Sequence, residues 1–169
     1  MDRRQAMSLI GCAGVVGLEA ASSARERLPG IYKLISWKTA NPDGSVVEPL
    51  GADPIGRITY HKSGLMSVML MRRGRKALAR IDPQTATDEE LREALRQTLG
   101  TNSGFIAYMG TFELNEDRSI VIHHIEGGSS ATFTGANFER RYTLTNKGLA
   151  LSVPPNFNSN LEWERVGDA

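Results

Sequence analysis

Hydrophobic and polar positions alternate in short runs over most of the chain after Pro29, with Gly, Asn, Asp and Pro between the runs. Such runs are typical of β-strands, because successive side chains of a strand point to opposite faces. Eight runs fit this pattern: residues 31–38, 55–61, 65–71, 103–114, 119–127, 137–144, 149–153 and 161–166. Most connections are short, so the pattern predicts an all-β, antiparallel, up-and-down arrangement. Eight strands can close a small barrel around side chains or one small ligand.

One segment, residues 87–100, has a helical pattern instead. Thr87 and Glu90 have the spacing of a capping box, and Gly100 stands where a helix C-terminus commonly has glycine. Three leucines fall on one face: Leu91, Leu95 and Leu99. The sequence therefore predicts one amphipathic helix between the third and fourth strands. Because both faces of the run 65–71 are apolar, we expect the leucines to cover its outer face.

The first 24 residues differ in composition from the rest. Arg3 and Arg4 precede an uncharged, small and apolar stretch, and Ala and Ser residues follow before Arg25. This layout is typical of a bacterial export signal, and the twin arginine indicates the route that exports folded proteins. We expect residues 1–24 to be an export signal, a barrel domain over 28–167, and a periplasmic or secreted protein.

Two alternatives for the N-terminus stay open. Residues 9–12 have the composition of a lipoprotein cleavage box, which would anchor the protein to lipid through Cys12, although the preceding apolar stretch is short. Glu19 within the apolar stretch favours an uncleaved N-terminal helix of a cytoplasmic protein. A membrane span is not expected, because the apolar run is shorter than the roughly 20 residues that cross a bilayer.

The composition narrows the classes of function. With 169 residues and a net charge of +1, the chain fits one soluble domain and has no basic excess that would indicate a nucleic-acid partner. Its single cysteine, Cys12, excludes an internal disulfide and a multi-cysteine metal site. Motifs of serine hydrolases, phosphate-binding loops and zinc peptidases are missing from the sequence, so no cofactor or metal is expected.

Several phrases recur in the order and spacing of a known family: "LPGIYKLISWK", "FIAYMGTFELNEDRSIVIHHIEGG", "ERRYTL" and "LEWERV". Over about residues 28–166 the chain resembles the bacterial and fungal lipocalin-like domain family of the calycin superfamily. It departs from the family at Tyr32, where Trp is usual, and in the segment 74–102. The resemblance implies an eight-stranded barrel with a cavity. It leaves the chemistry open, because related barrels include carriers, cyclases and isomerases.

The adjacent histidines of the run 119–127 cannot both line one pocket, because neighbouring strand residues face opposite sides. A zinc site built on His123 and His124 is therefore not expected. Either face could be interior. If it is the face of His124, this side chain and Glu126 are neighbours that could act as an acid/base pair; otherwise His123 alone faces the lumen.

The run 137–144 could supply a second part of a polar cluster, with Arg140 and Tyr142 on one face. A buried arginine needs a carboxylate partner, and we expect Glu126 to provide it. Such a cluster in an apolar cavity is typical of a small-molecule site. An ion pair that fixes strand register, or an exposed polar ladder, is the alternative.

Further candidate ligand-binding residues come from the neighbouring strands. Methionines adapt to varied apolar ligands, although they commonly serve as core filler; the candidates are Met66, Met69, Met71 and Met109. Tyr60 and Tyr108 could donate hydroxyl hydrogen bonds to a ligand. The basic residues Arg72, Arg73, Arg75 and Lys76 form either a solvated loop or a cluster that attracts a carboxylate-bearing ligand.

The leading hypothesis is a periplasmic barrel that binds a small hydrophobic or amphipathic molecule. The alternative is a cofactor-independent isomerase, cyclase or lyase, in which His124 or Glu126 is the acid/base and Arg140 or Tyr142 stabilises negative charge. A structural or interaction domain would follow if the lumen is filled. The sequence indicates neither the oligomeric state nor whether the protein is an enzyme.

Overall fold

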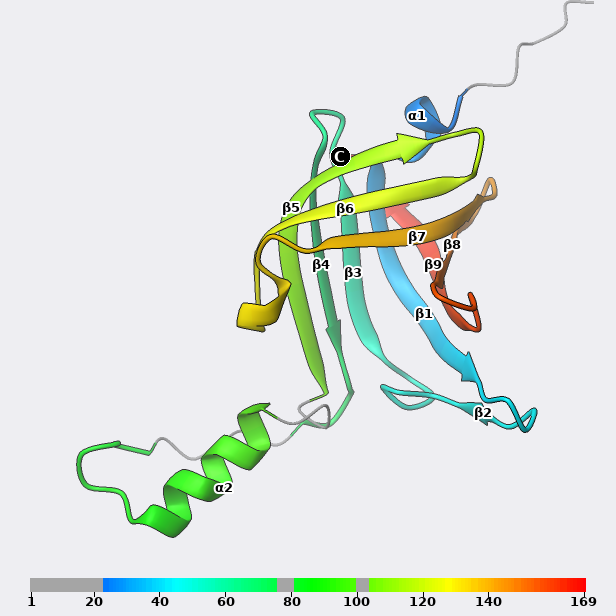
Figure 1. Cartoon of the computed structure of the whole chain (residues 1–169). Helices are drawn as coiled ribbons and strands as arrows, with labels where there is room; N and C mark the ends of the chain where they lie inside the picture. The colour runs from blue at the N-terminus through cyan, green and yellow to red at the C-terminus, as the bar shows by residue number, and fades with distance from the viewer. Residues whose placement is uncertain (1–22, 76–80, 100–103) are drawn as a thin grey trace, which may run out of the picture.

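The computed structural model describes residues 23–75, 81–99 and 104–169 (Figure 1). Most of the expected export signal, with Cys12, lies outside the described residues, and so does Lys76. The described part of the chain has nine strands: β1 (Gly30–Ala40), β2 (Val46–Val47), β3 (Ile55–Tyr60), β4 (Leu65–Met71), β5 (Phe105–Asn115), β6 (Ile120–Gly128), β7 (Asn137–Leu144), β8 (Gly148–Val153) and β9 (Ser159–Gly167). Its helices are α1 (Ala24–Arg27), α2 (Asp88–Leu99) and the 3₁₀ helix η2 (Ala131–Phe133).

Eight of these strands form a closed antiparallel barrel. Each pairs with its neighbour in the chain, and β1 also pairs with β9, with Trp37 opposite Leu161, so that the barrel has no free edge. The predicted all-β antiparallel barrel is confirmed. The short strand β2 was not predicted; it pairs with the far end of β1 and lies outside the closed ring.

Helix α2 lies between β4 and β5, and not between the third and fourth strands, because β2 adds one strand before it. The capping box is confirmed: the Glu90 amide donates to Thr87 Oγ1 at 3.3 Å, and the Thr87 amide donates to Glu90 Oε2 at 2.8 Å. The helix extends from the end of the barrel (Figure 1).

The expected packing of α2 on the outer face of β4 is wrong. Leu91 and Leu95 are 37% and 55% exposed, and Met69 on the outer face of β4 is 56% exposed. The leucine spacing correctly predicted a helix, and the contacts that the described residues show for it include local ones, such as the capping box and the Arg92–Asp88 ion pair. Such contacts form without a tertiary partner.

Because Leu95 is more than half exposed, we expect Leu95→Lys to change the free energy of unfolding of the barrel by less than about 0.5 kcal/mol. Leu70→Ala is the matched control: Leu70 is 5% exposed on the inner face of β4, and its truncation should cost at least about 2 kcal/mol. Urea unfolding followed by tryptophan fluorescence measures both. A loss above 1 kcal/mol for Leu95→Lys would mean that α2 packs on the barrel.

The core is built by the inner faces of the strands. In β4, Met66 and Val68 are buried, whereas their neighbours Leu65 and Met69 are exposed. This alternation follows from the two-residue period of a strand. Apolar side chains on the inner faces of all eight strands fill the barrel except at one end.

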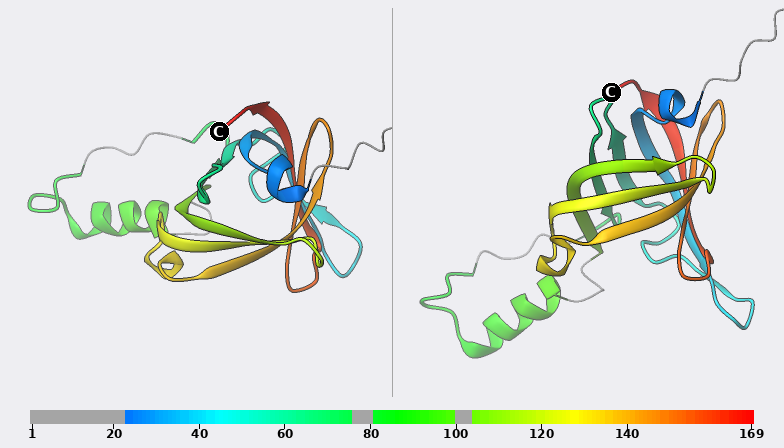
Figure 2. Two further views of the ribbon diagram at one scale, coloured as in Figure 1. Left: turned by 90° about the horizontal axis from the view of Figure 1, so that it is seen from above. Right: turned by 45° about the horizontal axis from the view of Figure 1, so that its top comes forward.

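The opposite end of the barrel is closed by α1 and the residues after it (Figure 2). Leu28 is fully buried there, and its carbonyl oxygen accepts a hydrogen bond from the Tyr32 hydroxyl at 2.8 Å. Arg165 donates to the carbonyl oxygens of Arg27 and Pro29 and to Tyr32 Oη, at 2.7–3.1 Å. Tyr32, the departure from the family pattern, is therefore a central part of this closure.

Candidate functional site

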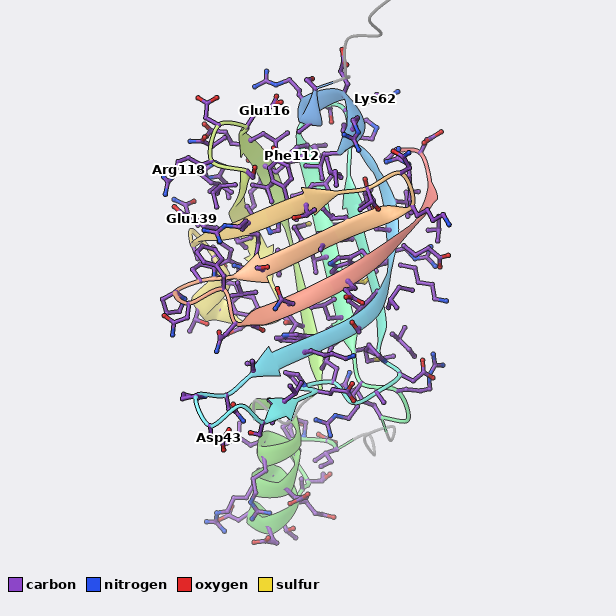
Figure 3. All side chains as sticks on the ribbon, turned by 90° about the vertical axis from the view of Figure 1, so that its right-hand side faces the viewer. Asp43, Lys62, Phe112, Glu116, Arg118 and Glu139 are labelled. Carbon is purple, nitrogen blue, oxygen red and sulfur yellow. The ribbon has the colours of Figure 1, made fainter. Side chains whose placement is uncertain are left out.

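A cavity of about 200 Å³ lies inside the barrel at the end away from α1. Its walls are mainly apolar and aromatic, and include Trp37, Val68, Leu151 and Trp163. Asp43, in the loop between β1 and β2, is labelled at this end in Figure 3, whereas Lys62, Phe112 and Glu116 are near α1. The lumen is therefore plugged at one end and hollow at the other.

His123 lies in the centre of the lumen and is fully buried. Its Nε2 is 2.7 Å from the hydroxyl oxygen of Tyr60, and its Nδ1 is 3.2 Å from that of Tyr108. The interior face of β6 is therefore the face of His123: Val121, His123 and Ile125 point inward, and His124 points outward. Only Tyr108 of the three linked side chains also lines the cavity.

Burial controls the charge of this group. Burial, and after it the positive charge of Arg140, lowers the pKa of His123 from 6.5 to about 3. Burial also raises the pKa of Tyr60 well above its usual value and raises that of Tyr108, against an opposing effect of Arg140. The histidine is therefore neutral and the two tyrosines are protonated at neutral pH.

The hydrogen bonds favour one tautomer of His123. Within the described residues, the hydroxyl of the fully buried Tyr60 has His123 Nε2 as its hydrogen-bond partner and no other. If Tyr60 donates to Nε2, then Nδ1 carries the proton and donates to the Tyr108 oxygen. The opposite tautomer would leave the Tyr60 hydroxyl without an acceptor, which is costly in a buried site. The Tyr108 hydroxyl hydrogen then remains available to the cavity.

Two further residues with polar side-chain groups line the cavity, Arg140 and Trp163. Arg140 donates to the carbonyl oxygen of Glu139 at 2.7 Å, lies over the Phe138 ring at 5.2 Å from its centre, and also interacts with the Tyr108 hydroxyl. Trp163 is 4% exposed, and its indole Nε1 has no acceptor in the described part of the chain. The expected Arg140–Glu126 pair is wrong, because Glu126 is exposed on the outer face of β6 and Arg140 is on the inner face of β7.

The other predicted site residues lie apart from the cavity. His124 is on the outer face, with Nδ1 2.8 Å from Asn137 Oδ1 and Nε2 3.5 Å from Glu113 Oε2. His124 and Glu126 thus share a face, as expected, but it is not the face of the lumen.

Of the residues predicted to bind a ligand, Tyr108 and Arg140 line the cavity. Tyr60, Met66 and Tyr142 are buried in the core away from it. Met69 and Met109 are 56% and 60% exposed, and Met71 is partly buried beside Met69 on the outside of the barrel, so the expected methionine wall of the cavity does not form.

Sequence reasoning predicted Tyr108 as a cavity residue but missed Trp37, Phe133 and Trp163. Trp163 could have been found, because it alternates with the buried Leu161 in the last predicted strand. Phe133 could not, because it lies in η2, which follows β6 and has no strand pattern. Phe133, Phe138 and Tyr108 pack edge to face, with ring centres 5.5–6.1 Å apart.

A closed eight-stranded antiparallel barrel with a plugged end and an internal cavity is a lipocalin-like architecture. The family model of the lipocalin-like domain matches residues 29–166, and the chain belongs to this family. A comparison with curated proteins gives no match. None of the helices in the described residues has the length and apolar character needed to cross a membrane.

Proposed function

We propose that this protein binds a small, largely apolar molecule in the cavity of its barrel. The observation that carries the proposal is the 200 Å³ cavity itself, which has apolar walls and a few polar groups. This is the usual composition of a small-molecule site. The volume is below the range of about 300–1,000 Å³ typical of drug-sized ligands, so the molecule is small.

The electrostatics support binding over acid/base catalysis. An efficient general acid or base has a pKa near the working pH. The pKa of His123 is lowered to about 3 and that of Tyr108 is raised by burial, so neither changes charge near neutrality. His124 and Glu126, the residues considered for an isomerase, cyclase or lyase, are on the outside of the barrel. The catalytic alternative therefore has weaker support.

The place of action that we propose is the periplasm. The support is the twin arginine followed by an apolar stretch in residues 1–24. Fractionation of the cells that produce the protein tests this, together with mass measurement of the mature protein. A periplasmic chain that begins at Arg25 agrees with it, and a full-length cytoplasmic chain overturns it.

Filling the cavity should abolish binding while the fold remains. Val68 lines the cavity, so Val68→Phe places a ring in the space that the ligand needs. The neighbouring Met69→Phe is the control, because Met69 is on the outer face of the same strand. Native mass spectrometry of protein purified from its own cells should show a bound small molecule with wild type and Met69→Phe, and none with Val68→Phe. The absence of any bound molecule in all three would overturn the proposed function.

A further inference from the structure

Arg140 differs from the ion-paired arginines of the structure. Arg73, Arg92, Arg96 and Arg165 each have a carboxylate within 4.0 Å. The side chain of Arg140 is partly buried at the cavity, and no carboxylate of the described residues is within that distance. The groups that it contacts are neutral: the Glu139 carbonyl, the Phe138 ring and the Tyr108 hydroxyl. This partly buried charge therefore has no opposite charge beside it within the described residues, and a bound carboxylate would supply one.

The Tyr108 hydroxyl, another polar group of the cavity, is also a donor, because its hydrogen is free in the favoured tautomer of His123. The Trp163 indole also lines the cavity, and its Nε1 is buried among protein atoms without an acceptor in the described residues. Trp37 Nε1 already donates to Ser159 Oγ at 2.7 Å. The cavity wall contains no carboxylate, carboxamide or histidine side chain in the described residues. Its polar character is therefore that of a site for hydrogen-bond acceptors and negative charge.

The apolar part of the cavity favours a flat ring. Tyr108, Phe133 and Phe138 form an edge-to-face cluster, and Trp37 and Trp163 also line the space. Aromatic rings associate favourably in offset or edge-to-face arrangements beyond what burial of area gives. A volume of about 200 Å³ is suited to one ring with a short substituent.

We propose that the ligand class of this cavity is a small aromatic carboxylate, with its carboxylate on the Arg140 guanidinium and its ring among the aromatic walls. The inference rests on the proposed binding function and adds the charge and shape of the ligand. An arginine and a carboxylate can form two parallel charge-assisted hydrogen bonds, which are stronger than neutral ones. Binding would supply the negative charge that the barrel lacks at this position.

Cinnamate and its neutral analogue cinnamamide test the charge directly, because they share the ring and differ in the anion. Isothermal titration calorimetry on the purified protein at pH 7 should give cinnamate at least a tenfold lower Kd than cinnamamide. Arg140→Met should remove this preference. Arg141→Met is the matched control, since Arg141 is the next residue of β7 on the exposed outer face, and it should keep the preference. Arg140→Lys, which retains the charge, should keep part of it.

The outcomes separate this inference from the proposed function. Wild type could bind both probes with equal affinity while Val68→Phe binds neither. That result would overturn the proposed anionic ligand and would leave the cavity as a binding site. A preference for cinnamate that survives in Arg140→Met overturns the role of Arg140. Failure of cinnamate, cinnamamide and the small neutral ring compound indole to bind overturns both proposals. If circular dichroism shows that Arg140→Met does not fold, the ratio of the Kd values for cinnamate and cinnamamide in wild type and Arg140→Lys tests the role of Arg140.

Discussion

Between pH 6.5 and pH 3 the protein should lose stability on the order of 4 kcal/mol through His123 alone. The pKa of this histidine is about 3 in the folded protein, against 6.5 for an ordinary histidine. In this window the unfolded chain binds a proton that the folded chain does not, so the free energy of unfolding falls as pH falls. Each unit of difference between the two pKa values corresponds to about 1.4 kcal/mol. The contribution is fully present above pH 6.5 and is lost progressively down to pH 3.

The lost stability can be assigned to His123 by comparison of three proteins. Carboxylates also contribute to acid sensitivity, so the quantity to measure is the difference in pH dependence between wild type and His123→Gln, which does not titrate. His124→Gln is the control, because His124 is the next residue of the same strand and is partly exposed on the outer face. Urea unfolding at pH 7, 5 and 4 should show a steep loss in wild type and His124→Gln and a shallower one in His123→Gln. Parallel curves for all three would contradict the buried, neutral state of His123.

Much of the barrel could be predicted from the sequence because its signals are local. The eight predicted runs correspond to the eight strands of the closed ring, since alternation and turn residues are properties of short segments. The two-residue β2 has too few positions for an alternating pattern. The helix α2 was predicted correctly from its cap and its leucines, whereas the prediction of its place on the outer face of β4 was wrong. That place depends on tertiary contacts, which an amphipathic pattern does not specify.

The site could be predicted only in part because the inner face of β6 cannot be read from its residues. Apolar side chains stand on both faces of this strand, with Ile122 outward and Val121 and Ile125 inward. A register shift opposite Met109 and Gly110 further separates sequence spacing from pairing. From the sequence, the lumen-facing histidine could therefore be either His123 or His124, and the pattern did not distinguish them. In the same way, Arg140 was considered as a possible lumen residue paired with Glu126, but its lack of a carboxylate partner follows from the placement of several strands at once.

Replacement of Arg165 by methionine should lower the free energy of unfolding by about 3 kcal/mol, although the residue is far from the cavity. The guanidinium closes the α1 end of the barrel by donating to two backbone carbonyls and to Tyr32 Oη, and it lies 5.5 Å from the centre of the Tyr32 ring. Gly30 allows this approach, because a Cβ atom there would be 2.6 Å from Arg165 Nη1. Hydrogen bonds from a charged group contribute about 1.5–3 kcal/mol each. The expected loss of about 3 kcal/mol is smaller than the sum over the three hydrogen bonds, because the Arg165 side chain is 32% exposed.

The alternative explanation for such a loss is the ion pair between Arg165 and Asp168, and Asp168→Asn tests it. The Asp168 side chain is 89% exposed, and exposed ion pairs contribute about 0–1 kcal/mol, so this variant should be nearly as stable as wild type. Arg165→Lys should fall between the two, because an ammonium group cannot reach all three acceptors in the geometry of the planar guanidinium. Urea unfolding at pH 7 measures all three variants. If Arg165→Met were within 1 kcal/mol of wild type, the closure would depend instead on the burial of Leu28 and Tyr32, both at most 1% exposed.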